Sequence, residues 1–216
     1  MMKFFFSLLL FLLPFTSIHG DEAEAIIDAW EDFTEACHER NGSDATKYVS
    51  SASREYYSEI QKLAVSATKE EIQALPLGKQ VTTLSIRMRV SPEDLQRMSG
   101  EALFIHSIDK GWIGKPRSED ETIAEIESTG NTATAKESVG GEITEHVVHF
   151  LKEDEQWKFD MLPTIRLVDE TFETTCAESG ESEEDFVEAF LKLITGESDV
   201  GDAWTPPLPL DSEREE

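Results

Sequence analysis

The sequence predicts an α+β fold in which N-terminal helices pack on a curved antiparallel β-meander and a helical extension follows. Two observations predict it. Through much of the first half of the chain, apolar residues recur every three or four positions, the period of helices that bury one face. Residues 121–162 instead alternate or are rich in β-formers between short turns, which is typical of antiparallel strands.

Residues 1–20 have the three-part pattern of a secretory signal peptide. A single Lys precedes a run of about twelve mostly apolar residues, and Thr16–Gly20 follows it. The run is shorter than the roughly 20 residues that a membrane-spanning helix needs. We therefore expect cleavage after Gly20, a secreted or periplasmic protein, and no membrane association after cleavage. The alternative is an uncleaved anchor.

Two helices are expected next, over residues 22–39 and about 45–67. The first has acidic residues in its first turn, where the helix dipole favours them, and ends at Asn41-Gly42-Ser43. Its apolar stripe consists of Ala25, Ile26, Ala29, Trp30, Phe33 and Cys37. The stripe of the second consists of Tyr48, Val49, Ala52, Tyr56, Ile60, Leu63 and Ala64.

A helical insertion is expected over about residues 68–115. Thr68 is followed three residues later by Glu71, which is the spacing of a capping box. Ser91-Pro92 begins another short helix, and a further helix is expected over about 101–109.

Residues 81–90 alternate between apolar and polar side chains and are predicted as a strand, with a short helical turn as the alternative. On a strand, Arg87 and Arg89 share one face. Residues 61–110 carry a net charge of +1 in an otherwise strongly acidic chain. Because Arg suits carboxylates, the two are candidate ligand-binding residues for an anion. Pairing with acids of neighbouring helices is the alternative.

Four strands are expected over residues 121–128, 132–138, 142–152 and 156–162, joined by short turns. Residues 166–216 then form an acidic C-terminal extension with a net charge of −13. It contains one clear helix at about 182–195, capped by Ser182, and an extended segment anchored by Trp204.

The hairpin at the end of the meander runs His149-Phe150-Leu151-Lys152, an acidic turn, then Gln156-Trp157-Lys158-Phe159-Asp160. With the two front helices, it resembles secreted bacterial members of the NTF2-like (SnoaL-like, cystatin-like cone) superfamily. The resemblance covers about residues 22–163 and implies a domain over 21–165, in which helices close a bent sheet around a pocket. Because that superfamily includes hydrolases, isomerases, ligand carriers and dimerisation modules, the resemblance selects no activity and carries over no catalytic residue.

Acid–base chemistry has one weak candidate pair, His146 and Asp160. His146 shares a strand face with Val148 and Phe150, and Asp160 lies on the last strand. A carboxylate or a histidine in an apolar pocket is what general acid–base catalysis requires. The alternative is a surface Lys158–Asp160 ladder with a satisfied histidine.

No metal site and no cofactor is expected. His146 and His149 are three residues apart on a predicted strand and therefore point to opposite faces. The sequence has no His-Glu-x-x-His, Cys-x-x-Cys, Gly-x-Ser-x-Gly or glycine-rich phosphate motif. Trp112 is expected either to line a pocket or to plug the domain. In an exported protein, Cys37 and Cys176 form either a disulfide or two buried free thiols.

The chain has 45 acidic and 19 basic residues, a formal charge of −26, which excludes sequence-independent nucleic-acid binding because that needs basic side chains to neutralise phosphates. The leading hypothesis is a secreted, soluble, non-catalytic binding or interaction module, whose partner is a small ligand, another protein or a second copy of the chain. The alternative is a small SnoaL-like pocket enzyme acting by acid–base catalysis on an apolar metabolite.

Overall fold

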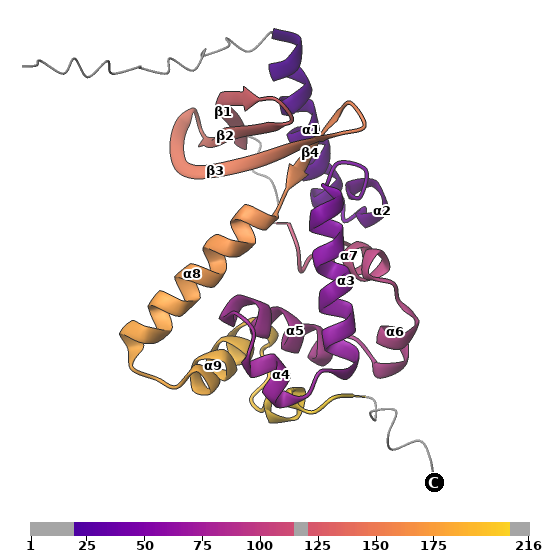
Figure 1. The fold of residues 1–216 in the computed structure, drawn as a ribbon, viewed down its shortest axis with the longest axis vertical. Helices are drawn as coiled ribbons and strands as arrows, with labels where there is room; N and C mark the ends of the chain where they lie inside the picture. The colour runs from indigo at the N-terminus through magenta and orange to yellow at the C-terminus, as the bar shows by residue number, and fades with distance from the viewer. Residues whose placement is uncertain (1–19, 115–120, 208–216) are drawn as a thin grey trace, which may run out of the picture.

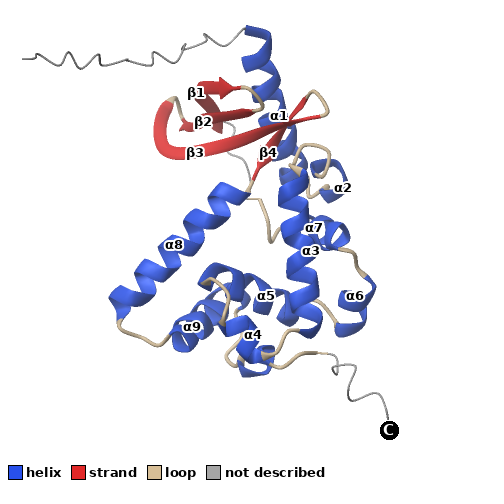
Figure 2. Cartoon of the chain, in the orientation of Figure 1, coloured by secondary structure: helices blue, strands red, loops and turns tan. Residues whose placement is uncertain are grey.

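The computed structural model describes residues 20–114 and 121–207 and confirms the predicted α+β architecture (Figure 1). Helices come first, a four-stranded antiparallel sheet follows, and further helices end the described chain (Figure 2). Residues 1–19 of the predicted signal peptide lie outside the described residues, and Gly20 begins helix α1. Among the described helices, none combines the length and apolarity that crossing a bilayer demands.

The first helices differ from expectation in where the second one begins. Helix α1 spans Gly20–His38, α2 is the short Gly42–Ala45, and α3 spans Ser51–Ser66. The chain between α2 and α3 is held instead by strand β4, because Phe159 donates its N–H to Tyr48 O and accepts one from Ser50 N. Helix α3 therefore begins after Ser50, whose side chain caps it.

The predicted strand over 81–90 is wrong, because those residues belong to helix α5, Leu77–Arg89. The helix is buried on most sides by α3, α8, α9 and the C-terminal segment. Leu77, Val81, Leu84 and Met88 recur at spacings of four, three and four and face the base core, but the apolar–polar alternation of residues 84–90 imitates a strand. Thr68 and Glu71 form the predicted capping box. The other helices of this part are α4 (Lys69–Gln73), α6 (Pro92–Arg97) and α7 (Gly100–Asp109).

The sheet is the predicted meander, in the order β1-β2-β3-β4. Its strands are β1 (Glu121–Thr129), β2 (Thr132–Val139), β3 (Glu142–Glu153) and β4 (Gln156–Asp160). Strand pairing is interrupted between β1 and β2 at Ala124/Glu127 and between β2 and β3 at Lys136/Ser138. Such irregularities bend strands, and β3 curls visibly in Figure 2.

Helix α9, Glu183–Thr195, forms where it was predicted, but the preceding helix α8, Leu162–Ser179, was missed. Its inward face is narrow: Ile165, Phe172 and Cys176 lie at helical spacing with the polar Asp169 among them, and most of its other residues are exposed, so the apolar pattern is weak. Helix α8 runs from the sheet to α9 along one side of the molecule (Figure 1), and the boundary expected at residue 165 falls inside it. The segment predicted as extended contains a 3₁₀ turn, Gly201–Trp204, and Trp204 is buried as expected.

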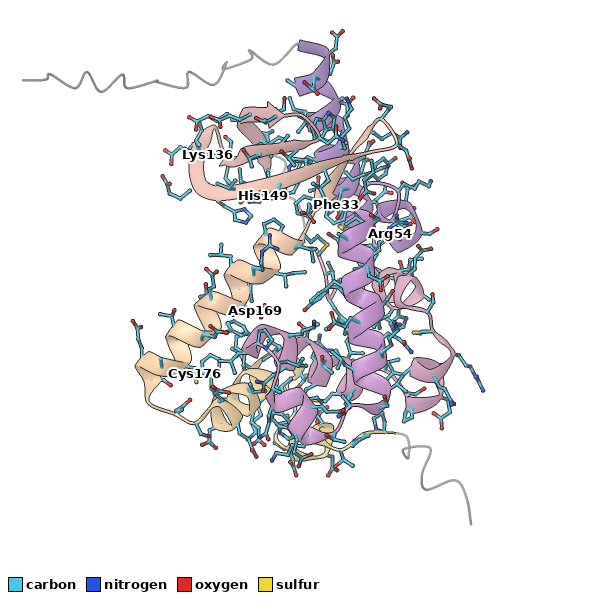
Figure 3. All side chains as sticks on the ribbon, in the orientation of Figure 1. Phe33, Arg54, Lys136, His149, Asp169 and Cys176 are labelled. Atoms are coloured by element: carbon cyan, nitrogen blue, oxygen red, sulfur yellow. The ribbon has the colours of Figure 1, made fainter. Side chains whose placement is uncertain are left out.

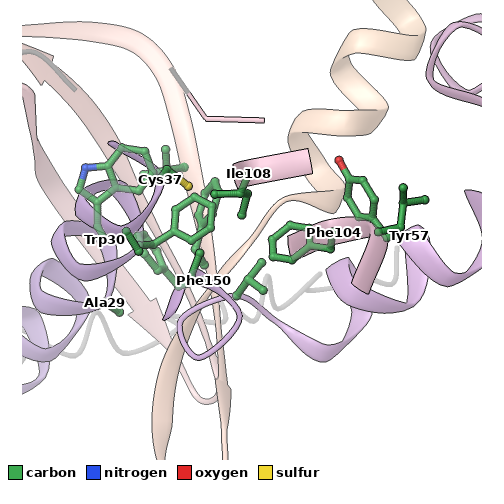
Figure 4. Packing of buried hydrophobic residues seen from close by; sticks show 14 of the residues in the cluster. Ala29, Trp30, Cys37, Tyr57, Phe104, Ile108 and Phe150 are labelled. Atoms are coloured by element: carbon green, nitrogen blue, oxygen red, sulfur yellow. The ribbon is translucent and has the colours of Figure 1, made fainter. Parts of the chain in front are cut away.

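Two hydrophobic cores hold these elements together. The sheet core joins the inner face of the sheet to α1, α3 and α7, as Figure 4 shows at close range. It includes Ile26, Trp30, Phe33, Cys37, Tyr57, Phe104, Ile108, Ile123, Ala135, Val148, Phe150, Trp157 and Phe159. The base core joins the helical insertion to the C-terminal extension. It consists of Ala67, Ile72, Leu77, Val81, Leu84, Cys176, Val187, Leu191, Val200, Ala203 and Trp204.

Candidate functional site

A cavity of about 240 Å³, the sheet pocket, lies between α1, the inner face of the sheet and the first turn of α8. Helix α1 contributes four residues at helical spacing, because positions three and four apart share one face. The described lining consists of Trp30, Phe33, Thr34, Cys37, Ile113, Gly114, Glu121, Glu137, His146, Phe159, Met161, Thr164 and Ile165.

Three aromatic rings form one wall of the pocket. The ring of Phe159 lies edge-to-face against Trp30, with centroids 5.2 Å apart, and is tilted against Phe33 at 4.9 Å. Edge-to-face and offset contacts at these distances are the favoured arrangements of aromatic pairs, so the three rings support one another. Cys37, Ile113, Gly114, Met161 and Ile165 extend this apolar surface, which suits the apolar part of a molecule.

The polar edge of the pocket comes from three neighbouring strands. Glu121 of β1 and Glu137 of β2 are only 6% and 5% exposed, and His146 of β3 faces Glu137. The distance from His146 Nδ1 to Glu137 Oε2 is 3.3 Å, although among the described atoms the contact lacks the alignment of a hydrogen bond. An imidazole within reach of a carboxylate is an arrangement that can transfer a proton, so this edge has the groups that acid–base chemistry requires.

The irregular pairing between β2 and β3 positions this edge. Lys136 pairs with Val147 and Ser138 with Ile143, so three residues of β3 lie opposite Glu137 alone. Thr144 holds the irregularity, since its hydroxyl donates to Glu137 O at 3.1 Å and accepts from His146 N at 3.2 Å. Bulges of this kind re-aim side chains, here that of His146 toward the pocket.

Asp160, the predicted partner of His146, has a different role. Strand register pairs Asp160 with His149, which is three residues from His146 along β3. Its Oδ1 atom accepts hydrogen bonds from the hydroxyls of Ser50 and Ser53, both at 3.1 Å, and so fastens the start of α3 to the sheet. The structure thus places His146 in the lining of the sheet pocket beside Glu137, and Asp160 outside the described lining.

Glu137 was not predicted as a site residue, although its position in strand β2 is recognisable from the sequence. Ala133, Ala135 and Glu137 alternate on one face of β2, so an acid occupies the third position of an otherwise apolar row. A lone carboxylate on the buried face of a strand indicates a functional position more strongly than an acid in a surface run.

Arg87 and Arg89 bind carbonyl groups rather than an anion or acidic side chains. Buried Arg87 donates to the backbone oxygens of five residues, at 2.5–3.3 Å. Those oxygens belong to Leu63, Ala64, Ala67, Ala203 and Trp204. Arg89 donates to Ile194 O at 2.7 Å. Basic side chains satisfy the free carbonyls at helix C-termini in this way, and burial lowers the pKa of Arg87 to about 10.

Trp112 packs against the sheet core and is absent from the described lining of the sheet pocket. Its half-buried ring packs against the sheet core, edge-to-face with His106 at 5.3 Å, and the Arg89 guanidinium lies 5.2 Å from its centroid. The pocket begins at the next two residues, Ile113 and Gly114.

Cys37 and Cys176 are buried free thiols, and they do not form the disulfide that the sequence left open as the other possibility. Cys37 belongs to the sheet core and lines the pocket, where burial raises its pKa to about 12. Cys176 belongs to the base core. Gly114 passes so close to Cys37 that a methyl group there would lie 2.7 Å from Cys37 Cβ, and its φ of 77° also favours glycine.

A second hollow, of about 340 Å³, lies on the other side of His146, between β3 and α8. His149 projects from β3 toward α8 here (Figure 3). Burial lowers the pKa of His149, and the neighbouring charges of Arg166 and His146 lower it further while Asp160 opposes them. In residues 20–114 and 121–207, no three His, Cys, Asp or Glu side chains are arranged to hold a metal ion.

No family model, no curated protein sequence and no solved structure matches this chain. The site is therefore interpreted from its own geometry.

Proposed function

We propose that this chain is a binding protein for a small, largely apolar ligand that occupies the sheet pocket. The observation that carries the proposal is the pocket itself: aromatic and aliphatic walls with three polar groups gathered at one edge. Few polar groups that fix orientation within an apolar concave surface are the usual composition of small-molecule sites.

The size of the pocket fits a ligand of modest size. An apolar cavity of about 150 Å³ is enough to bind benzene, and the sheet pocket measures about 240 Å³. Removing about 150 Å² of ligand apolar surface from water contributes about 4 kcal/mol before the cost of association, at about 25 cal/mol per Å². An aromatic or short alkyl body with one polar group meets both conditions.

The architecture supports the proposal that the chain is of the NTF2-like type, because helix α1 closes the inner face of a bent four-stranded meander around the pocket. The pattern of residues 1–20 supports export, which places the ligand in a secreted or periplasmic setting. N-terminal sequencing of the protein from its native source tests this second point, and a mature chain that starts at Met1 would contradict it.

Filling the pocket tests the binding proposal. We expect indole, used as a probe in ligand-observed NMR, to bind the wild type, and Thr34→Phe to abolish binding because the new ring projects from α1 into the pocket. Thr171→Phe makes the same change at an exposed site on α8 and should leave binding intact. Indole binding that survives in both variants would place the ligand elsewhere, and a failure of the wild type to bind would contradict the proposal.

The contact between His146 and Glu137 favours one second candidate, a pocket enzyme acting by acid–base catalysis on an apolar metabolite. A histidine within 3.3 Å of a buried carboxylate can take up and return a proton at the edge of an apolar site. Small molecules that co-purify with native protein would be incubated with fresh protein and followed by mass spectrometry. Conversion that is lost in His146→Ala and kept in His149→Ala, on the opposite face of β3, identifies an enzyme; unchanged ligand identifies a carrier.

A further inference from the structure

The described lining of the hollow of about 340 Å³, here called the outer groove, comes from two elements, β3 and α8. Residues 145, 147 and 149 alternate along β3 and therefore share its outer face. Residues 163, 166, 167 and 170 are spaced as neighbours on one side of a helix, and they form the facing side of α8. A strand face and a helix face thus lie opposite each other across the groove.

The groove is a wedge that opens away from the corner where β4 runs into α8. Strand register pairs His149 with Asp160, and α8 begins two residues later. Beyond this corner α8 leaves the sheet, as Figure 1 shows. Along β3, Glu145 lies about 13 Å from His149, at about 3.3 Å per residue. Along α8, Glu170 lies about 6 Å beyond Arg166, at about 1.5 Å per residue. Arg166 is therefore nearer the closed end of the wedge, and both acids are nearer its open end.

Arg166 carries a positive charge that has no partner among the described residues. No described acid pairs with its guanidinium and no described oxygen accepts a hydrogen bond from it, although Glu170 occupies the i+4 position at which helical ion pairs form. Burial lowers the pKa of His149, and the charge of Arg166 lowers it further. At pH 7.5 the imidazole is therefore neutral, and Arg166 is the cation of the closed end.

The closed end has two further features that suit a carboxylate. The first turn of α8 lies there, where Thr164 lines the groove and the N-cap residue Met161 makes no side-chain capping hydrogen bond. Helix N-termini favour anions through their free N–H groups and the helix dipole. The acid nearest this end, Asp160, is already compensated, because the hydroxyls of Ser50 and Ser53 donate to its Oδ1 atom.

Beyond Arg166 the lining of the groove becomes apolar and then acidic. Leu167 of α8 and Val147 of β3 are 53% and 36% exposed, and both line the groove. The exposed acids Glu145 and Glu170 follow at the open end. Two acids attract a cation and oppose the entry of a molecule that carries only a negative charge. The order of cation, apolar surface and acids therefore matches a molecule with opposite charges at its two ends.

We propose that the outer groove binds small zwitterions of the ω-amino acid class. The carboxylate lies at Arg166 and the start of α8, and the aliphatic body lies between Val147 and Leu167. The ammonium group lies at Glu145 and Glu170. This site is separate from the sheet pocket, so its test does not depend on the function proposed for that pocket.

Three probes with the same six-carbon chain test the proposal: 6-aminohexanoate, hexanoate and hexylamine. Each would be titrated into isotope-labelled protein at pH 7.5 in about 0.15 M salt, where long-range attraction is screened, and followed by amide NMR shifts. Because exposed ion pairs contribute modestly, we expect 6-aminohexanoate to bind about threefold more tightly, or more, than either singly charged probe. The shifts should concentrate in residues 145–149 and 163–170.

Charge-removing variants assign the two ends. Arg166→Gln should reduce the affinity for 6-aminohexanoate to that for hexylamine, because the carboxylate loses its partner. The double variant Glu145→Gln/Glu170→Gln should reduce it to that for hexanoate. Arg97→Gln and Glu178→Gln, at exposed positions outside the described groove lining, should keep the wild-type preference. The amide spectrum of each variant shows at the same time whether it is folded.

Equal affinity for the three probes would overturn the proposal, and so would a preference for 6-aminohexanoate that survives Arg166→Gln. Shifts that lie outside β3 and α8 would place the ligand elsewhere and overturn it as well. If 6-aminohexanoate did not bind measurably, the outer groove would not be a zwitterion site, whether or not indole occupies the sheet pocket.

Discussion

Beside the base core, buried Arg87 meets five backbone carbonyl oxygens, whereas in the sheet core the buried carboxylates Glu121 and Glu137 lie along the wall of an open pocket. Both arrangements remove charge from water, which is costly. The fixed acceptors around Arg87 join three parts of the chain: α5, the C-terminal end of α3 and the C-terminal segment. Placing Glu121 and Glu137 beside free volume leaves room for a molecule that is not part of the chain. The buried charge of Arg87 therefore has a structural role, whereas Glu121 and Glu137, which also make contacts of their own, lie where a molecule in the sheet pocket would meet them.

The largest effect is expected from breaking the saturated charge. Arg87→Met should lower the free energy of unfolding by about 4–5 kcal/mol, because several buried carbonyl groups lose their donor and each unsatisfied group costs about 1–3 kcal/mol. Urea denaturation measures the change. The control is Arg97→Met on the exposed side of α6, which should stay within about 0.5 kcal/mol of the wild type. An effect of Arg87→Met as small as that of Arg97→Met would contradict the structural role of Arg87.

Trp204→Ala tests whether the base core depends on the C-terminal segment. Trp204 is 4% exposed and its Nε1 donates to Glu188 at 3.2 Å, so its removal leaves a large cavity beside α9. We expect a loss of about 3 kcal/mol, in line with other buried tryptophan truncations. Native-state hydrogen exchange should show the loss of protection concentrated in α5 and α9. An equal loss in β2 and β3 would mean that the two cores open as one unit.

The elements that the sequence revealed and those it concealed differ in how they meet solvent. The meander and α9 each bury one face, so their period 2 and period 3.6 survive in the sequence. Helices α5 and α8 also carry apolar residues at helical spacing, Leu77, Val81, Leu84 and Met88 in α5 and Ile165, Phe172 and Cys176 in α8. The pattern of α5 is obscured because buried polar residues alternate with apolar ones over residues 84–90, and that of α8 because its buried face is narrow.

The site was half predictable for a related reason. His146 could be assigned to the inner face from its alternation with Val148 and Phe150. Its partner could not be identified, because the choice between Asp160 and Glu137 depends on strand register and on the irregularity opposite Glu137. The hydrogen-bond partners of Arg87 and Arg89 could not be predicted either, because they are backbone carbonyl oxygens, which every residue type has.

Glu137→Gln should change stability little, in contrast to Arg87→Met. Glutamine keeps the shape of the side chain and an acceptor oxygen, so it can keep hydrogen bonds that Glu137 accepts. We expect a change of under about 1 kcal/mol of either sign in the free energy of unfolding, measured by urea denaturation in the absence of ligand. Residues selected for binding are commonly neutral or unfavourable for stability. A loss above about 2 kcal/mol would place Glu137 with Arg87 as a structural charge and remove the distinction between the two regions.

The smallest expected effect belongs to His149, which lies on the opposite face of β3 from the pocket and has a lowered pKa because it is partly buried. An unfolded histidine titrates near pH 6.5. Between that pH and the lower folded value, the unfolded chain binds the extra proton, so stability should fall as the pH falls from 8 toward 5.5. His149→Gln should flatten this part of the urea-midpoint profile, whereas His38→Gln, at an exposed position, should follow the wild type. If the stability of His149→Gln fell more steeply with falling pH than that of the wild type, burial and the neighbouring charges would not lower the pKa of His149 as the structure indicates. His149 would then resemble Arg87, a charge that the fold accommodates.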